Sequence, residues 1–420
     1  MRSFAYVCSL ASVVLAAEPW INEVDTGLTD FLFSTNYTEG SLPLLKDMRA
    51  VVDFDYAAHQ FLDKQKYSFY RTAAGGEWSY RNNLDVWKKV MLRPRHLHDV
   101  SKLNETLPVT FLGYNFSAPI FIAPAARGGY ANPERAELNF VDAAAKENIL
   151  YTAALYATKT IEELAAQKHD DTMNGPQVMF QQVCLALKSL REILLRLTTT
   201  QIYTNANFSV TWDAMARAEK AGAKAFVWTI DAPGDSTRHR AARYDTTNAN
   251  GATSALTWDL YDEIKSRTSL PVIPKGIVTV EDALTAIEKG APAIYLSNHG
   301  GRQLEYSPSP LEIAYEIYRN APQVFQQVEV MADSGVRYGT DVLKLMALGV
   351  KMVGLGRPFM YANCYGTEGV EKLIQIIKTE IVHDGAQAGV TDLRKVPRSL
   401  INARPLEANV FLMEGATGSV

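Results

Sequence analysis

The stretch Val328–Pro358, VEVMADSGVRYGTDVLKLMALGVKMVGLGRP, contains one complete unit of the predicted fold. It opens with a short apolar run, Val328–Asp333, and continues with an amphipathic segment, Thr340–Leu348. Gly349 follows that segment, at a place where the end of a helix favours a left-handed residue. A second apolar run, Lys351–Leu355, completes the unit. Both runs are almost entirely apolar, as strands buried on both faces are, so the unit is predicted to be strand, helix and parallel strand.

The same unit recurs along the chain from residue 119 onward. Six further apolar runs have the same character: Ile120–Ala123, Ile149–Ala153, Val178–Gln182, Ala225–Ile230, Val272–Lys275 and Ala293–Ser297. Segments with helical spacing lie between the runs, among them Glu134–Asn148, Thr160–Gln167, Thr211–Ala221 and Val280–Lys289. Eight strands alternating with helices predict an α/β fold with a parallel sheet, and eight is the number that closes a (β/α)8 TIM barrel. A doubly wound open sheet is the alternative, although it would not gather chemical groups from nearly every strand end.

The chain on either side of the barrel has a different character. Residues 18–118 are predicted to form an N-terminal helical cap, with a helix over Asp53–Lys66 and a loop over Phe69–Trp78. The barrel is expected over residues 119–400, including an amphipathic C-terminal helix over residues 369–382. Residues 401–420 are expected to be a tail, and the chain beyond Pro397 to be a loose arm.

Composition excludes several classes of protein. Of the 420 residues, 47% are apolar and 21% are charged, which is ordinary globular composition and excludes a disordered or collagen-like chain. Lys and Arg number 42 against 46 Asp and Glu, so no basic excess exists and nucleic-acid binding is not expected. Three cysteines cannot build a disulfide framework, and the seven histidines lack zinc-site spacing, so no metal is expected.

The N-terminus is predicted to be a signal peptide over residues 1–17, MRSFAYVCSLASVVLAA. Arg2 provides the positive charge, an apolar run follows, and two small residues precede the cleavage site. A buried first helix is the alternative. The run is too short to span a membrane, and no other stretch is long enough to do so. Four Asn-x-Ser/Thr sequences, at Asn36, Asn104, Asn115 and Asn207, favour a secreted glycoprotein.

The segment Val183–Gln201, VCLALKSLREILLRLTTTQ, interrupts the pattern after the third strand. Without it, Phe180-Gln181-Gln182 would continue directly into Ile202-Tyr203-Thr204. Val codons begin with GT and one Gln codon ends with AG, which are the boundaries of a short in-frame intron, so a retained intron is one hypothesis. An inserted helical loop is the alternative, since the leucines have helical spacing. Sequencing the transcript would decide between them.

Polar residues stand at the predicted carboxyl ends of the strands, where barrel enzymes place their active sites. The loops Asp333–Arg337 and Gly356–Pro358 follow the last two strands. Each combines small residues with an arginine, and the two loops together suit a phosphate group.

A second set of strand-end residues suits acid–base chemistry on an anion. His299 follows the sixth strand, and Asp231 ends the fourth, where it would hold the imidazole in one tautomer. Arg238 and Arg302 suit a carboxylate, although Arg238 stands in a basic run that would also fit a solvated loop. Lys275 ends the fifth strand and suits a developing anion, with a buried ion pair as the alternative.

These residues resemble the family of FMN-dependent α-hydroxy-acid oxidases and dehydrogenases, which includes glycolate oxidase, lactate oxidase and the flavin domain of flavocytochrome b2. The similarity extends from about Tyr56 to about Leu400. It rests on SNHGGRQ at 297–303, LPVIPKG at 270–276, GVRYGTDV at 335–342, TIDAP at 229–233 and GRP at 356–358.

The resemblance implies a role for each matching residue. His299 would be the active-site base, Asp231 its orienting partner and Lys275 the group that stabilises the anionic reduced flavin. Arg302, Arg238 and Tyr203 would contact the substrate. The residues expected around FMN are Pro124, Ala125, Ala126, Ala154, Gln182, Thr229, Lys275, Ser297, Asp333, Ser334, Gly335, Arg337, Gly356 and Arg357. The reaction would convert R-CHOH-COO⁻ to R-CO-COO⁻ by hydride transfer or through a carbanion, which the sequence leaves open.

Several positions depart from the family pattern. Phe69 stands at the substrate-binding position of a tyrosine, Ala125 at that of a threonine and Ala154 at that of a serine. Ser334 replaces a glycine, and Arg127 brings a charge to an apolar position. The departures predict an atypical substrate, larger or differently charged, or an enzyme with weakened catalysis.

The function expected from the sequence is secreted FMN-dependent oxidation of a 2-hydroxy acid. With no haem-binding domain or membrane segment recognisable, O₂ is the expected acceptor and H₂O₂ the product. A dehydrogenase with another acceptor, an FMN isomerase without net redox chemistry and a non-catalytic binding barrel are the alternatives. The resemblance also suggests a homo-oligomer.

Overall fold

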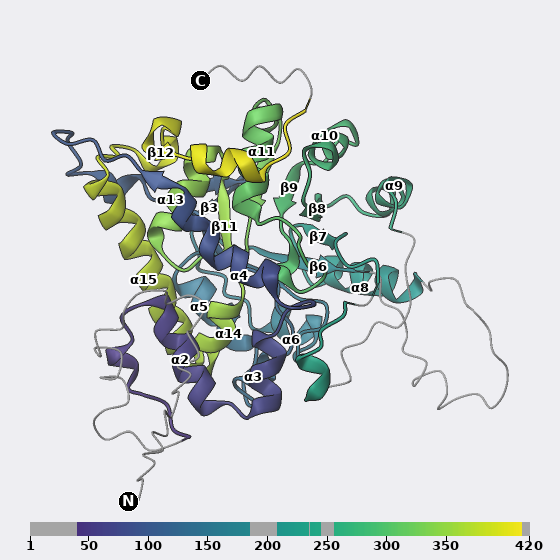
Figure 1. Cartoon of the computed structure of the whole chain (residues 1–420). Helices are drawn as coiled ribbons and strands as arrows, with labels where there is room; N and C mark the ends of the chain where they lie inside the picture. Colours follow the sequence, from purple (N-terminus) through teal and green to yellow (C-terminus); the bar gives the residue numbers. More distant parts are fainter. Residues whose placement is uncertain (1–39, 185–207, 235, 245–255, 414–420) are drawn as a thin grey trace, which may run out of the picture.

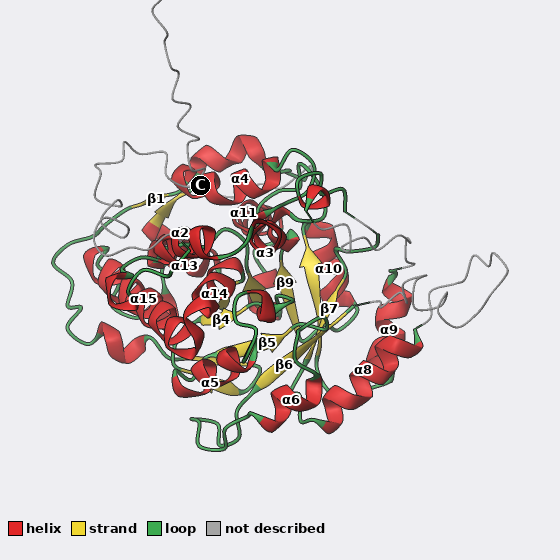
Figure 2. Ribbon diagram, turned by 90° about the horizontal axis from the view of Figure 1, so that it is seen from below, coloured by secondary structure: helices red, strands yellow, loops and turns green. Residues whose placement is uncertain are grey.

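The computed structural model describes residues 40–184, 208–234, 236–244 and 256–413. Its centre is a closed barrel of eight parallel strands, which follow one another around the barrel in chain order (Figures 1 and 2). The strands are β4 (Ile120–Ile122), β5 (Leu150–Ala153), β6 (Met179–Val183), β7 (Phe226–Thr229), β8 (Val272–Ile277), β9 (Ala293–Leu296), β10 (Glu329–Ala332) and β11 (Met352–Leu355). The predicted (β/α)8 barrel is confirmed.

Helices follow the strands and surround the barrel (Figure 2). They are α5 (Leu138–Lys146), α6 (Ile161–Ala166), α8 (Ser209–Lys220), α9 (Trp258–Ser266), α10 (Val280–Glu288), α11 (Pro310–Asn320), α12 (Val324–Gln327), α13 (Gly339–Leu348), α14 (Arg357–Ala362) and α15 (Gly366–Gln387). The side chains of Thr279 and Ser309 accept backbone N–H bonds at the N-termini of α10 and α11. Gly349 has φ of 106° just after α13, as predicted, and Gly222 and Gly290 have φ of 78° and 70° just after α8 and α10.

A hairpin closes the end of the barrel opposite the strands' carboxyl ends. Its strands are β2 (Val109–Phe111) and β3 (Tyr114–Phe116). Phe111 and Phe116 are fully buried and pack in one cluster with barrel residues such as Phe121 and Phe180. This end is filled with apolar side chains, and the ligand-sized cavity among the described residues lies at the other end.

The cap consists of α2 (Val51–Phe61), α3 (Lys64–Arg71) and α4 (Trp78–Asp85). The single helix predicted over Asp53–Lys66 is wrong, because Asp63 starts a new helix by accepting the Lys66 N–H at 2.9 Å. The loop predicted from Phe69 starts instead at Thr72, since α3 continues through Arg71. α2 packs against α14, and α4 against residues 299–301.

The C-terminal region is ordered further than the sequence suggests. The arm predicted beyond Pro397 is wrong as far as Met413, the last residue that the structure describes. β12 (Ile401–Asn402) pairs antiparallel with β1 (Met91–Leu92), and Leu406 is fully buried. Burial of these apolar groups holds residues 398–409 against the barrel.

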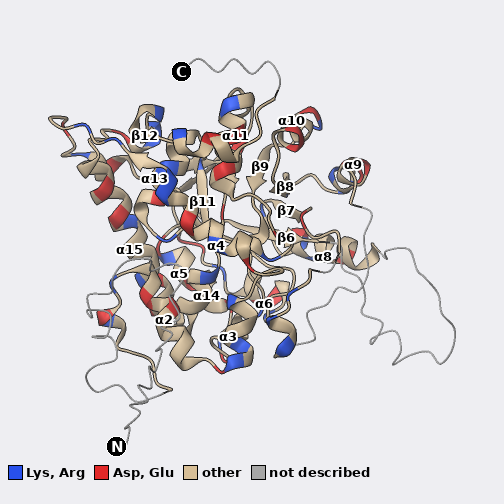
Figure 3. Cartoon of the chain, in the orientation of Figure 1, with Lys and Arg blue, Asp and Glu red and all other residues tan. Residues whose placement is uncertain are grey.

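Both basic and acidic residues are present on the outer helices α11, α13 and α15 in the view of Figure 3. None of the helices in the described part of the chain has the length and apolar character needed to cross a bilayer. Residues 1–17, 185–201, Asn36 and Asn207 lie outside the described residues, so the predictions that fall on them stay predictions. The side chains of Asn104 and Asn115 are exposed.

Candidate active site

A cavity of about 910 Å³ lies at the carboxyl ends of the barrel strands, beneath the cap. Its walls come from residues at the ends of the barrel strands or in the loops that follow them, and from α3 and α4 of the cap. The volume lies within the range of about 300–1,000 Å³ that is usual for ligand pockets. Its place is the one where barrel enzymes hold their active sites.

Most of the residues predicted for the site line this cavity. They are Phe69, Pro124, Ala125, Ala126, Ala154, Gln182, Thr229, Arg238, Lys275, His299, Arg302, Asp333, Ser334, Gly335, Arg337, Gly356 and Arg357. Asp231 and Ser297 lie behind this wall, where they contact lining residues. Tyr203 lies outside the described residues.

His299 and Asp231 form the predicted base and its partner. The Nδ1 atom of His299 lies 2.8 Å from Oδ1 of Asp231, which leaves Nε2 as the other ring nitrogen. Burial lowers the pKa of His299, and the Asp231 charge opposes this only in part. Burial alone would raise the pKa of Asp231, but the charges of His299 and Lys275 outweigh it and lower that pKa. The pair is therefore a neutral imidazole beside a carboxylate, which suits proton acceptance.

Three polar contacts fix further side chains at the strand ends. Lys275, only 3% exposed, donates from Nζ to Ser297 Oγ at 3.1 Å, and its Nζ lies 3.6 Å from Asp231 Oδ2. Lys275 therefore forms the buried ion pair with Asp231 and also lines the cavity, where its ammonium group can stabilise a developing anion. Gln182 donates from Nε2 to Thr229 Oγ1 at 2.8 Å. These bonds hold polar groups of four strands in place around the cavity floor.

The two arginines predicted to bind a carboxylate lie together. Arg238 donates from Nε to the Arg302 carbonyl at 3.0 Å and from Nη2 to Gln303 Oε1 at 2.8 Å. Arg302 donates from Nη1 to the carbonyls of Phe69 and Thr72, at 2.7 and 3.0 Å. Burial lowers the pKa of Arg302 well below its ordinary value, and the positive charges of nearby arginines lower it further. A buried cation in this state favours an anionic ligand.

Arg357 has a structural role that the sequence did not indicate. It donates to the carbonyls of Tyr70, Gly300 and Thr72 at 2.8, 2.9 and 3.1 Å. Arg302 and Arg357 therefore both hold the C-terminal end of α3 and the adjoining Thr72 over the cavity. Contacts between residues more than 200 positions apart leave no local pattern in a sequence, so sequence reasoning missed them.

The loop after β10 is shaped for close approach of a ligand. Asp333 accepts from Tyr295 Oη and from Ser334 Oγ, each at 2.7 Å. Ser334 and Gly335 have φ of 71° and 89°, which is unusual for serine. A Cβ at Gly335 would lie 1.8 Å from the carbonyl oxygen of Asn83, so glycine is required there.

The charges of the cavity fit FMN. Among its described lining residues, six are Lys or Arg and only Asp333 is acidic. Such an excess suits a phosphate dianion together with a carboxylate. Arg337 and the loops after β10 and β11 would hold the phosphate, and Lys275, Gln182 and Thr229 stand at the strand ends where a flat ring would lie. Within the described ranges, no group of three His, Cys, Asp or Glu side chains is placed to hold a metal ion.

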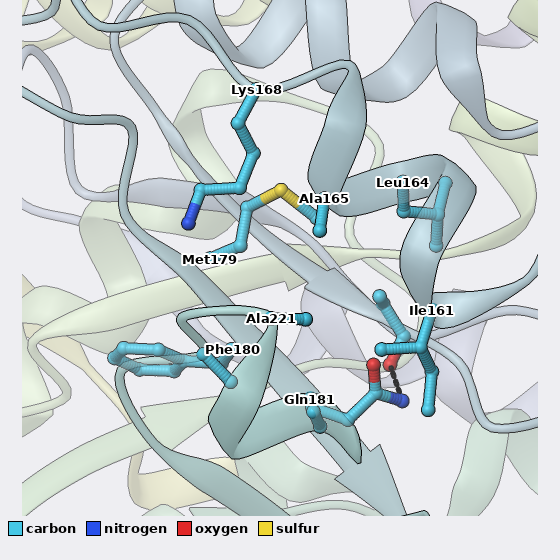
Figure 4. Close-up of a pocket in the computed structure, with 11 residues that line it drawn as sticks. Ile161, Leu164, Ala165, Lys168, Met179, Phe180, Gln181 and Ala221 are labelled. Carbon is cyan, nitrogen blue, oxygen red and sulfur yellow. Dashed lines mark hydrogen bonds between the residues drawn. The ribbon is translucent and has the colours of Figure 1, made fainter.

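A second, much smaller void of about 20 Å³ lies among Ile161, Leu164, Met179 and neighbouring side chains (Figure 4). Lys168 borders it but donates to the Gly222 carbonyl at 3.1 Å. Gln181 donates to the Ala153 carbonyl at 3.2 Å. The void has room for a water molecule and none for a cofactor.

The cavity also contains residues that the sequence analysis did not include in the site. Tyr156, which is 50% exposed, follows β5, and Arg127 follows β4. The sequence signal for Arg127 was its charge at an apolar position of the family pattern, whereas Tyr156 gave no signal.

The family is decided by comparison with known proteins. A model of the FMN-dependent dehydrogenase family matches residues 58–254 and 245–403 of the chain. The chain belongs to the FMN-dependent dehydrogenase family. The predicted family, the FMN cofactor and the class of FMN-dependent oxidoreductase are confirmed, while the roles of individual site residues stay predictions.

Two relatives within this family have stated activities. The L-lactate dehydrogenase (cytochrome) of Saccharomyces cerevisiae is 32% identical over 393 residues, which cover 87% of this chain and 63% of that protein. A peroxisomal (S)-2-hydroxyacid oxidase of Arabidopsis thaliana is 33% identical over 376 residues, which cover 83% of this chain and 95% of the oxidase.

Solved structures of the family share the fold. A mutant flavocytochrome b2 with pyruvate bound has a TM-score of 0.78 and 31% identity, covering 88% of this chain and 90% of that one. A mandelate oxidase variant with benzoyl-formic acid has a TM-score of 0.71 and 30% identity, covering 84% of this chain and 98% of the oxidase.

Proposed function

We propose that this member of the FMN-dependent dehydrogenase family oxidises an (S)-2-hydroxy acid to the 2-oxo acid and passes the electrons to O₂, giving H₂O₂. The observation that carries the proposal is the His299 imidazole, held by Asp231, in a cavity that also contains Arg238 and Arg302. A base beside paired guanidinium groups suits a substrate with a carboxylate next to a C–OH group.

The chain's own residues divide the work as follows. Arg302 and Arg238 bind the substrate carboxylate and orient the neighbouring carbon. His299 Nε2 takes one proton from the substrate, and the charge of Asp231 stabilises the imidazolium that results. FMN, when bound, accepts the two electrons that the substrate loses. Lys275 provides a buried ammonium that stabilises negative charge in the cavity.

Two relatives support different acceptors, so the acceptor is part of the proposal. The oxidase of Arabidopsis thaliana favours O₂, and 95% of its length is matched. The yeast relative carries cytochrome in its name and favours the alternative, a dehydrogenase with another acceptor. O₂ consumption with an equal amount of H₂O₂ supports an oxidase. Turnover only with an added dye or cytochrome contradicts it.

Export, N-glycosylation at Asn36, Asn104, Asn115 and Asn207, and a homo-oligomer belong to the same proposal. They rest on the predicted signal peptide, the four sequence motifs and the family resemblance. N-terminal sequencing of secreted protein, its mass before and after glycosidase treatment, and light scattering test the three points separately.

The visible spectrum of the purified protein tests the function directly. We expect flavin absorbance that bleaches without air on addition of a 2-hydroxy acid and returns with air. A colourless protein would contradict FMN binding. Flavin that no 2-hydroxy acid bleaches would contradict the reaction and favour the second candidate, a flavin-binding barrel with weakened catalysis. The observation that supports this candidate is Phe69, which stands at the position of a substrate-binding tyrosine and lacks its hydroxyl group.

A further inference from the structure

Arg127 lines the cavity from the loop after β4. Its backbone is left-handed, with φ of 62°, a conformation that few residues other than glycine adopt. Its guanidinium carbon lies 4.7 Å from the ring centre of Phe69 and 5.4 Å from that of Tyr130. Nη1 donates to the Tyr130 hydroxyl at 2.6 Å. The guanidinium group is therefore positioned by aromatic contacts on the cavity wall.

Phe69 connects this group with the carboxylate site. The guanidinium carbon of Arg302 lies 5.3 Å from the same Phe69 ring centre. Burial lowers the pKa of Arg302, and the charges of Arg238, Arg357 and Arg127 lower it further. Arg127 thus shares the Phe69 ring with Arg302, one of the two arginines that the proposed function gives to the substrate carboxylate.

The FMN site and the proposed function together account for every other cationic side chain among the described lining residues. Arg337 and Arg357 adjoin the phosphate loops, Arg302 and Arg238 meet the substrate carboxylate, and Lys275 stabilises charge at the strand ends. Neither FMN nor a simple 2-hydroxy acid gives Arg127 a role. A fixed guanidinium group on the cavity wall beside Phe69 is suited to a second anion.

We propose that the substrate is a 2-hydroxydicarboxylate, a 2-hydroxy acid with a second carboxylate on its side chain, and that Arg127 binds this second carboxylate. The inference rests on the proposed function and narrows its substrate class. Ala125, Ala126 and Ala154 are small residues in the same wall and leave room for a side chain that extends towards Arg127. The competing role for Arg127 is binding of the carboxylate next to the C–OH group, in place of the hydroxyl that Phe69 lacks.

The first test uses the unaltered holoenzyme. (S)-2-Hydroxyglutarate and (S)-2-hydroxysuccinate are compared with their side-chain amides, which have the same shape without the second charge. We expect kcat/KM to be about 10- to 100-fold higher for the acids, as the loss of a charge-assisted hydrogen bond implies. Equal values, or higher values for the amides, would overturn the proposal.

The second test asks whether Arg127 is the source of that preference. Arg127→Met is expected to reduce the acid-to-amide ratio of kcat/KM towards one, and Arg127→Lys to restore part of it. Arg135→Met, which removes an arginine that pairs with Asp142 outside the cavity, is the control and should leave the ratio unchanged. If Arg127→Met lowers kcat/KM equally for acids and amides, Arg127 binds the carboxylate shared by both, and the proposal is wrong.

A binding measurement makes the outcome independent of turnover. Calorimetric titration of the holoenzyme with 2-oxoglutarate and with its 5-amide should show weaker binding of the diacid to Arg127→Met and little change for the amide. Bleaching of the flavin by 2-hydroxy acids with uncharged side chains, without a preference for diacids, would leave the proposed function intact and overturn only this inference. Absence of bleaching by any 2-hydroxy acid would overturn the proposed function itself.

Discussion

Asp231→Asn is expected to slow the reduction of bound flavin by about a thousandfold while FMN stays bound. The carboxylate of Asp231 accepts the Nδ1 proton of His299 at 2.8 Å, so the neutral ring presents Nε2 as its acceptor. An amide at the same place can donate to Nδ1, which leaves the ring proton on Nε2. In that tautomer Nε2 cannot take a proton from the substrate, and the base is lost.

The magnitude follows from the charge that Asp231 contributes. Two unit charges about 4 Å apart interact by about 4 kcal/mol at an effective dielectric constant of about 20. Since about 1.4 kcal/mol corresponds to a tenfold change in rate, loss of the carboxylate charge beside the forming imidazolium slows the step by about 10³-fold. The side chain of Asp231 is only 10% exposed, so water screens this pair weakly.

The assay is anaerobic stopped-flow measurement of flavin bleaching at saturating 2-hydroxy acid. Asp142→Asn is the matched control, because Asp142 Oδ1 lies 3.0 Å from His169 Nε2 in a second Asp–His pair that lies outside the cavity. This control should leave the rate unchanged. A rate for Asp231→Asn within tenfold of the parent rate would refute the role given to the pair.

The pH dependence gives a second readout of the same pair. The rate should rise with pH through the pKa of His299, which burial places below its ordinary 6.5, and should level off above it. The carboxylate of Asp231 raises that pKa, so its removal should move the rising limb to lower pH. A limb that stays in place would show that another group controls proton transfer.

Three further predictions concern binding and stability. Burial raises the pKa of Glu380 to about 7 from its ordinary value of 4.5. The protonated side chain therefore stabilises the fold fully below pH 4.5, and this contribution is lost as the pH rises through about 7. Glu380→Gln should remove this decline in the free energy of unfolding, measured with urea between about pH 5 and pH 7.5. Gly335→Ala should weaken FMN binding and cost about 1–3 kcal/mol of stability, because φ at this position is 89° and the new Cβ would meet the Asn83 carbonyl. Gly113→Ala is the control: φ at Gly113 is 83°, but the space around it is open, so FMN binding should stay unchanged. Leu406→Ala should lower the free energy of unfolding by about 2–5 kcal/mol, because this side chain is fully buried.

Each of these predictions has an outcome that would contradict it. A pH slope that persists in Glu380→Gln would assign the titration to a neighbouring acid such as Asp384 or Asp341. Unchanged FMN affinity in Gly335→Ala would mean that the loop after β10 can move away from Asn83. A change of less than about 1 kcal/mol in Leu406→Ala would mean that the C-terminal segment is only loosely held.

The sequence predicted the barrel because its signal repeats. Eight apolar runs alternate with helical segments, and the observed strands begin and end within two residues of those runs. The site followed from the same pattern, since the carboxyl ends of parallel strands meet at one end of a barrel and bring His299, Lys275 and Asp333 together.

Other features were less accessible for identifiable reasons. The break between α2 and α3 had a local signal in Asp63, a good helix-capping residue, which the longer helical pattern concealed. The C-terminal segment had none, because Leu406 and Ile401 are buried against residues far away in the sequence. Arg302 and Arg357 likewise bind the cap through backbone carbonyls. Every residue has such a carbonyl, so the residue types of the cap do not indicate these bonds.

These bonds connect the arginines of the cavity with the position of the cap. Burial of a guanidinium group without an anion is unfavourable, and the carbonyls of Phe69 and Thr72 offset only part of the cost for Arg302. A carboxylate that enters the cavity neutralises this charge and thereby strengthens the position of the guanidinium group, to which the cap carbonyls are bound. Arg357 makes the same kind of contact through Tyr70, so an anion near either arginine stabilises the same cap segment. A bound substrate therefore stabilises the cap residues above it, and a substitution at Arg302 should change both the substrate affinity and the stability of the cap.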